Sequence, residues 1–397
     1  MRALPLVLRA LSSGVLVAAL AAAPGSSAVT DTNAVQWQVA PGVIYEQFDT
    51  VTAAGPQRVY VLDIDPSVPG VSLDYAHNAH LRDRAQTSTI LEQNPATVAG
   101  VNGNFFDISD TGAPLGIGRA RDHRVLHAPA YGWNNAFYQA ADGSYHVGQL
   151  HLVASIAQHP GWSVTGLNTP NVKTDSITVF THSWGKNAGM SVINAPGRPL
   201  VGKVSSDSGL PPAPPRTGVK VREVHVKKGV VVSNSKVLHQ GSYVHGQMLV
   251  GEGLGARKLG KLAVGTPLNV SWSLDQKPLM AITGSQVLVR GGKPVAHNDG
   301  QNAPRTTVGV DANTGHVLIV ATDGRQTFAK GFTMGGMAGL LVRLGVTDAV
   351  NLDGGGSTTV VSRNADGSAM GVTNSPSAGH QRWVADALAV DYTAPPA

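Results

Sequence analysis

The sequence predicts an α+β fold that is predominantly antiparallel and mixed β-sheet with a few helices. Three observations predict it. Polar and apolar residues alternate in the strand period along Arg58–Ile64 and Val71–Tyr75. Glycine and proline, at 47 and 24 of 397 residues, are frequent enough for many turns between short strands. One helix is expected over Met334–Leu344, with Thr333 placed to cap its start and Gly345 its end.

The other elements follow from local patterns of the same kind. They are a short helix over Thr87–Gln93 capped by Thr87 or Ser88, a buried strand over Thr97–Val101, a hairpin formed by Thr306–Val310 and His316–Ala321, a strand within Val346–Leu352 and another over Thr358–Ser362. Small-residue turns and polar alternation over Leu238–Leu274 are typical of antiparallel β structure.

The first 28 residues have the pattern of a signal peptide. Arg2 and Arg9 accompany the short apolar run Leu11–Ala23, and Ser26–Ala28 offers small residues where a signal peptidase cuts. The run is too short to span a bilayer. We therefore expect cleavage of residues 1–28, secretion of the mature protein and no stable membrane insertion.

Composition excludes several classes of protein. The chain has no cysteine, so disulfides and thiolate metal sites are excluded. Its net charge of +5 fits acidic substrates such as phosphate-bearing cell-wall polymers, although basic surfaces are common. No dense run of lysine and arginine is interleaved with aromatics, so nucleic acid is not expected as a partner.

A glycine loop follows the predicted strand within Val346–Leu352. Its residues are Asp353, Gly354, Gly355, Gly356, Ser357 and Thr358. Three glycines allow positive φ and close approach of a ligand, and consecutive N–H groups in such a turn can bind an anion. A plain turn explains three glycines alone. The acid fixed at the end of an apolar strand favours a site in which Asp353 acts in catalysis.

Two arginines flank the predicted hairpin. Arg305 and Thr306 stand at its start, and Asp323 and Arg325 follow its end. Two neighbouring guanidinium groups would hold a phosphate through parallel hydrogen bonds, and Asp323 would orient one of them or transfer a proton. Taken alone, an edge-strand charge and a solvated Asp-Gly turn explain these residues more simply.

Further polar residues follow the buried strand Thr97–Val101. Asn102 and Asn104 can bind sugar hydroxyls, and Asp107 is another candidate carboxylate. The alternative is a hairpin turn at Asn-Gly, with the two phenylalanines that follow packed in the core.

Taken together, these segments resemble the phosphodiester glycosidase family, which includes the animal uncovering enzyme. The resemblance is carried by Gly100–Asp107, Val287–Val295, Ala303–Asp311, Ala321–Gln326, Gly331–Thr359 and Gln381–Val390, whose order and spacing match the family pattern. Trp383 and Asp386 stand where the family usually has proline and asparagine. The resemblance implies a phosphodiester glycosidase domain over residues 95–392, divergent at about 130–280, after an N-terminal β-rich segment at 29–94.

The resemblance implies a secreted hydrolase that cleaves a sugar from a sugar-1-phosphodiester. Arg305 and Arg325 would bind the phosphate, helped by N–H groups of the glycine loop, while Asp353 and Asp323 (or Asp107) divide the acid–base work. The expected partner is a sugar phosphodiester or a phosphorylated glycan. No cofactor is required by the sequence, although a divalent metal ion is compatible with it.

Two rival hypotheses remain open at this point. The same residues would serve a non-catalytic binder, or an accessory factor, for anionic cell-wall polysaccharide or exopolysaccharide. A metal-dependent phosphodiesterase is the third hypothesis.

Overall fold

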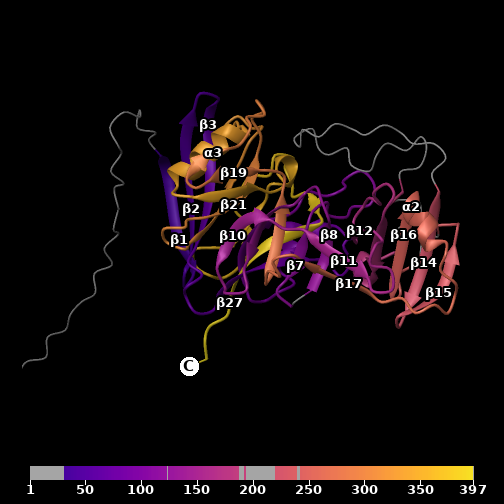
Figure 1. Cartoon of the computed structure of the whole chain (residues 1–397). Coiled ribbons are helices and arrows are strands. Elements are labelled where there is room, and N and C mark those ends of the chain that lie inside the picture. Colours follow the sequence, from indigo (N-terminus) through magenta and orange to yellow (C-terminus); the bar gives the residue numbers. More distant parts are fainter. Residues whose placement is uncertain (1–30, 123, 187–191, 194–219, 239–241, 397) are drawn as a thin grey trace, which may run out of the picture. The chain divides into compact units, whose positions relative to one another are not determined.

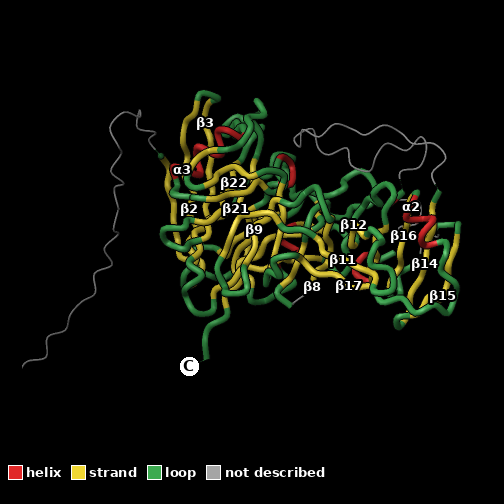
Figure 2. The backbone as a smooth tube through the Cα atoms, viewed as in Figure 1, coloured by secondary structure: helices red, strands yellow, loops and turns green. Residues whose placement is uncertain are grey.

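Strands, most of them paired antiparallel, are the main regular secondary structure, as the ribbon and the backbone trace show (Figure 1) (Figure 2). The computed structural model describes residues 31–396 apart from 123, 187–191, 194–219 and 239–241. The predicted signal peptide, residues 1–28, lies outside the described residues. The predicted fold class is confirmed, because the described elements are mixed and antiparallel sheets with three short α-helices.

Two sheets hold the N-terminal and C-terminal parts of the chain together. The eight-stranded sheet contains, in spatial order, β1 (Thr32–Ala40), β2 (Val43–Thr52), β3 (Gly55–Ile64), β22 (Val317–Thr322), β21 (Arg305–Val310), β23 (Asp348–Asn351), β19 (Val287–Arg290) and β20 (Lys293–Pro294). The five-stranded sheet contains β25 (Met370–Val372), β24 (Val360–Arg363), β6 (Thr97–Asn102), β27 (Asp386–Tyr392) and β4 (Val71–His77). Strands from 29–94 therefore lie in the same sheets as strands from 95–392.

The middle of the chain forms a third, ten-stranded sheet. Its strands are, in spatial order, β10 (Tyr145–Gln149), β9 (Asn135–Gln139), β18 (Met280–Gly284), β7 (Gly118–Ala120), β8 (Arg124–Pro129), β12 (Val164–Leu167), β13 (Ile177–Thr181), β16 (Gln247–Glu252), β14 (Val221–Lys227) and β15 (Val230–Ser235). Two smaller pairs are β11 (Leu152–Ile156) with β17 (Val270–Leu274), and β5 (Ala85–Gln86) with β26 (Trp383–Val384). Among the described pairs, β12 and β13 run parallel.

The alternation predicted along the strands separates two apolar cores. On β3, Tyr60, Leu62 and Ile64 pack in the core that the eight-stranded and five-stranded sheets share. Val59 and Val61, which point to the opposite face, pack in a second core. Side chains that alternate across a strand produce this division.

The helix α3 (Met334–Arg343) covers the second core. Met337 and Leu341, four residues apart on one helical face, are buried there against the eight-stranded sheet. Thr333 accepts a hydrogen bond from the Gly336 N–H at 3.0 Å, and Gly345 has a φ of +89° just beyond the helix. The predicted helix, its cap and its terminating glycine are confirmed.

β18 connects the middle region to the rest of the fold. Its residues Met280 and Ile282 face the core shared by the eight-stranded and five-stranded sheets, whereas Ala281 faces the core of the middle region. The middle core includes buried residues of β13, β16 and β17. The region expected to diverge, at about 130–280, therefore packs onto the remaining sheets through side chains of β18.

Two local expectations differ from the structure. The short helix is α1 (Thr87–Leu91), and its N-cap residue is Gln86 rather than Thr87 or Ser88. A distant side chain replaces the local cap, because Gln381 accepts from the Ser88 N–H at 3.1 Å. The helix α2 (Leu254–Leu259) was not expected, because its two turns lie among glycines.

Replacing Thr333 by alanine tests the capping of α3. Thr333→Ala leaves the Gly336 N–H without its side-chain acceptor, so we expect the free energy of unfolding to fall by about 1 kcal/mol. Urea titration followed by circular dichroism measures the change. Thr333→Ser keeps the hydroxyl and is expected to stay near wild type. Equal losses in both variants would contradict the capping role.

Candidate active site

Three neighbouring strands of the eight-stranded sheet begin or end along the same edge, the one formed by the strand ends. β21 begins at Arg305, β22 ends at Thr322, and β23 ends at Asn351. Because β21 pairs antiparallel with both neighbours, Arg305 lies opposite Thr322, and the end of β23 lies beside the start of β21. Asp323 and Asp353 follow these strand ends, so they start from one edge of the sheet.

Asn102 joins the second sheet to this edge. It is the last residue of β6, and its side chain is 0% exposed. Its Nδ2 donates to the carbonyl of Asp353 at 2.6 Å, and its Oδ1 accepts from Thr306 Oγ1 at 2.9 Å and from Thr359 N at 3.1 Å. The Asn102 side chain thus binds both ends of the glycine loop. It could contact a sugar, as predicted, only if these hydrogen bonds were broken.

The glycine loop turns tightly after its aspartate. It forms a 3-10 turn, η4 (Gly355–Ser357), in which Gly355 has a φ of +59°, a conformation that glycine adopts without steric cost. The first and last amides of η4 donate to the carbonyls of Pro304 and Gly354 at 2.8 and 3.1 Å. Of the amides expected to bind an anion, those of Gly354 and Gly356 make no hydrogen bond to the described residues.

Arg382 lies against this loop, although sequence reasoning did not single it out. Its Nη1 donates to Ser357 Oγ at 3.1 Å, and the side chain is partly exposed. A Cβ atom on Gly356 would lie 2.3 Å from Arg382 Nη2, so glycine leaves the room that the guanidinium occupies. A positive charge therefore stands at the loop where an anion can reach it. The signal in the sequence was its place in the segment Gln381–Val390, but spacing alone does not show which loop that segment meets.

Asp323 is buried and held by three donors. Tyr60 Oη donates to it at 2.6 Å, Ser375 N at 3.1 Å and Asn374 Nδ2 at 3.2 Å. Asn374 Nδ2 also donates to the carbonyl of Thr358 at 3.2 Å, which links this carboxylate to the glycine loop. Burial raises the pKa of Asp323, and the hydrogen bonds from Tyr60 and Asn374 oppose that rise.

Arg305 is a buried cation that anchors the site to its surroundings. Its side chain is 2% exposed, and it donates from Nε to the Phe332 carbonyl at 2.8 Å. Its Nη2 donates to Asp299 Oδ2 at 2.6 Å and to the Gln301 carbonyl at 2.7 Å. Its Nη1 makes no hydrogen bond to the described residues.

Asp353 and Arg325 lie closer to the surface. Asp353 is 6% exposed, and Gly354 beside it is partly exposed. Arg325 is exposed in the turn after Asp323 and has a φ of +61°, a conformation that residues other than glycine rarely adopt. Such backbone conformations cluster at functional sites, where surrounding contacts hold them.

Two other predicted residues are held by partners outside the glycine loop. Asp107 is fully buried, and its Oδ2 accepts from the N–H and the hydroxyl of Thr111 at 2.8 and 2.7 Å, which closes its own turn. Asn104 accepts from Thr283 Oγ1 at 2.8 Å and donates from its backbone N–H to Asp386 Oδ1 at 2.6 Å. The structure therefore shows structural contacts for both side chains.

Asp386 belongs to a buried chain of titratable groups. Tyr75 Oη lies 2.8 Å from Asp386 Oδ2 and 2.7 Å from His127 Nε2, and His127 Nδ1 lies 2.7 Å from the Gly116 carbonyl. Burial raises the pKa of Asp386 to about 6 and lowers that of His127 to about 3. At neutral pH, His127 is therefore uncharged, and its Nδ1 carries the proton donated to Gly116.

No group of three histidine, aspartate or glutamate side chains gathers as a metal site within the described residues. The divalent metal ion named as compatible with the sequence stays a prediction. The arrangement contains two buried carboxylates, of Asp323 and Asp353, and a partly exposed cation on a glycine loop. Such groups can bind an anion and move a proton beside it.

Replacing Gly356 by alanine tests the contact between Arg382 and the glycine loop. The new methyl group would displace the guanidinium, so we expect Gly356→Ala to destabilise the wild-type protein more than an Arg382→Ala background. A double-mutant cycle from urea unfolding measures the coupling. Gly371→Ala, where a Cβ meets open space, is the matched control. Equal effects of Gly356→Ala in both backgrounds would contradict the contact.

Replacing Asp386 by asparagine tests the buried chain. Because folding raises this pKa from 3.8 to about 6, Asp386 makes the free energy of unfolding fall as pH rises through that window. His127, lowered from 6.5 to about 3, acts in the opposite direction. Asp386→Asn removes the effect of Asp386 and leaves that of His127. As pH falls from 6 to 4, the free energy of unfolding of the variant should therefore decrease more than that of wild type, by on the order of 3 kcal/mol.

Urea titrations at several pH values measure this difference, with the exposed Asp366→Asn as control. Parallel pH profiles of the Asp386 variant and wild type would show that the acid is ionised in the folded protein at pH 4.

Two solved structures have the fold of this chain. One is a hypothetical protein from Synechocystis, with a TM-score of 0.69 and 20% identity over 93% of this chain and 64% of that one. The other, from Burkholderia pseudomallei K96243 and named as a candidate exported protein, has a TM-score of 0.69 and 19% identity over 92% of this chain and 97% of that one. This chain thus spans 64% of the Synechocystis protein's length. At these identities the likeness concerns the fold alone.

A third solved structure is more distant. The catalytic domain of zebrafish N-acetylglucosamine-1-phosphodiester alpha-N-acetylglucosaminidase, auto-inhibited by its pro-peptide, has a TM-score of 0.43 and 15% identity over 89% of this chain and 85% of that one. That TM-score supports no conclusion about this chain. No protein with a curated description matches the sequence. Within the described residues, the helices are too short or too polar to cross a bilayer.

The family comparison agrees with the motifs. Residues 209–391 match the family model described as phosphodiester glycosidase, and this range contains Arg305, Asp323, Asp353 and Arg382. The match begins inside the region expected to diverge, at 130–280. The resemblance predicted from the motifs is confirmed over residues 209–391, which are similar to the phosphodiester glycosidase family.

Proposed function

We propose that this chain is a secreted hydrolase that releases a sugar from a sugar-1-phosphodiester. One observation carries the proposal. The glycine loop lies within the range that matches the family model, Asp353 stands at its start, and Arg382 donates a hydrogen bond to the hydroxyl of its Ser357. A cation beside a carboxylate at a strand end suits a reaction in which phosphate leaves while water attacks.

Each charged group has a role in the proposal that follows from its surroundings. Arg382 and Ser357 bind the phosphate, and Arg325 and Arg305 add positive charge. Asp353, buried beside the partly exposed Gly354, takes a proton from water. Asp323 holds its three hydrogen bonds and positions the loop through Asn374.

The reaction breaks one bond and forms one bond. Water attacks the anomeric carbon, Asp353 accepts a proton from it, and the bond from that carbon to the bridging oxygen breaks. The phosphomonoester leaves with the electron pair of that bond, and the sugar gains a hydroxyl group. A phosphate leaving group needs little protonation, so one acting carboxylate suffices. Attack at phosphorus is the alternative and gives the same products.

The proposed substrate is a phosphorylated glycan of the cell wall or of an exopolysaccharide. The net charge of +5 favours such an acidic polymer. Secretion is supported by the pattern in residues 1–28 and by the candidate exported protein from Burkholderia that has this fold. The reaction as written needs no cofactor.

Hydrolysis of a sugar-1-phosphodiester in ¹⁸O-water tests the reaction. We expect the label in the free sugar, because water attacks carbon. We further expect Asp353→Asn to lower kcat by about 10²–10⁴-fold, the usual range for removing a general base, with KM little changed. Asp366→Asn, an exposed carboxylate in another loop, is the matched control.

Each contrary result has its own meaning. Label in the phosphomonoester would assign the attack to phosphorus. Unchanged turnover in Asp353→Asn would remove this residue from the chemistry. Binding of phosphorylated glycan by wild type without any turnover would favour the non-catalytic binder instead.

A further inference from the structure

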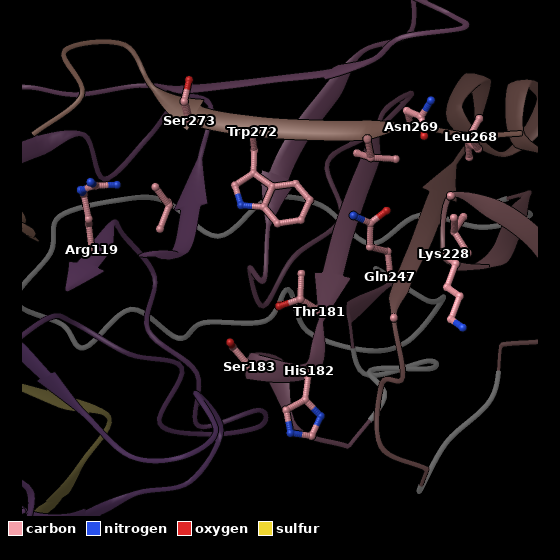
Figure 3. A pocket seen from close by; sticks show the side chains of 15 residues that line it. Arg119, Thr181, His182, Ser183, Lys228, Gln247, Leu268, Asn269, Trp272 and Ser273 are labelled. Carbon is pink, nitrogen blue, oxygen red and sulfur yellow. The ribbon is translucent and has the colours of Figure 1, made fainter. Parts of the chain in front are cut away.

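A cavity of about 750 Å³ lies in the middle region, apart from the residues of the candidate active site (Figure 3). β7, β13, β16 and β17 contribute to its lining, together with the turn between β14 and β15. Its volume falls within the range of small-molecule sites, about 300–1,000 Å³. None of its lining residues belongs to the glycine loop or to the arginines and acids around it.

An aromatic ring occupies the middle of this cavity. Trp272 stands on β17, and its indole projects from that strand toward Thr181 and Gln247 in Figure 3. The ring is partly buried and packs on the core of the middle region with one part of its surface. An indole fixed in this way offers a rigid apolar surface, with a polar N–H at its edge.

Polar side chains also line this cavity. The amides of Gln247 and Asn269 and the hydroxyls of Ser183 and Ser273 line the cavity, and they make no hydrogen bond to the described residues. Each amide carries two donors and an acceptor, and each hydroxyl both donates and accepts. These groups match a ligand that itself carries several hydroxyls.

Two cations flank the ring. Figure 3 places the Trp272 indole between Arg119 and Lys228, and no aspartate or glutamate belongs to the lining. Lys228 has a φ of +48° in the two-residue turn between β14 and β15, next to Gly229 with a φ of +73°. Burial lowers the pKa of Arg119, and Asp122 opposes that shift.

We propose that this cavity binds an anionic saccharide unit. The sugar ring lies on Trp272, Gln247 binds its hydroxyls, and Lys228 receives a negatively charged substituent. Phosphate and carboxylate substituents share this chemistry. The proposal concerns a second binding site, beyond the proposed reaction, and it stands without catalysis.

Fluorine NMR on the full chain labelled with 5-fluorotryptophan tests the site directly. The probes are three trisaccharides of one backbone: neutral, phosphorylated and carboxylated. We expect a saturable shift of the Trp272 resonance, which Trp272→Phe identifies by its absence, and at least tenfold tighter binding of a charged probe than of the neutral one. The two charged probes distinguish phosphate from carboxylate as the substituent.

Lys228→Asn is the sharpest variant, because asparagine tolerates positive φ and keeps the turn while the charge is removed. We expect it to lose most of the preference for charged probes and to keep the affinity for the neutral one. Tyr131→Ala, an exposed aromatic outside this cavity, should bind like wild type.

Two results would overturn the proposal: no shift of the Trp272 resonance with any probe, or an unchanged preference for charged probes in Lys228→Asn. Turnover of a small sugar-1-phosphodiester, measured in parallel, tests the proposed function separately, and Trp272→Phe should leave it unchanged.

Discussion

The side chain of Asn102 is the interaction on which the candidate site depends. A single buried amide binds the carbonyl of Asp353 at the start of the glycine loop and the N–H of Thr359 at its end. It also binds Thr306 on the neighbouring sheet. Leaving any one of these buried groups unpaired costs about 1–3 kcal/mol, so the two sheets and the loop are held in one arrangement. The loop can therefore carry three glycines and still have a defined shape.

The two acids of the site differ because their surroundings differ. Asp323 is held by Tyr60, Asn374 and Ser375, and its carboxylate serves the structure of the loop as much as any reaction. Asp353 stands nearer the surface, beside a partly exposed glycine. Arg305 and Arg382 differ in the same way. The first is buried against Asp299, and the second reaches the loop from a distant segment while remaining partly exposed.

Sequence reasoning succeeded where the structure is local. The hairpin of β21 and β22, the capped helix α3 and the strand before Asp353 follow from turn residues and periodicity within a few positions. It could not find Arg382 or Tyr60, because Arg382 meets Ser357 across 25 residues and Tyr60 meets Asp323 across 263, and no local pattern encodes either contact. It also treated Arg305 as free for a ligand. The pairing with Asp299 depends on how the loop before β21 packs against α3, which spacing does not reveal.

The position of β27 has a consequence for the order in which the protein assembles. This strand, Asp386–Tyr392, lies between β4 and β6 and pairs with both of them. Residues of β4 and β6 thus pair with residues that follow them by 285 to 321 positions in the chain, and such long-range pairing is slow to form. A chain that is still being synthesised therefore cannot complete the five-stranded sheet until β27 has been made.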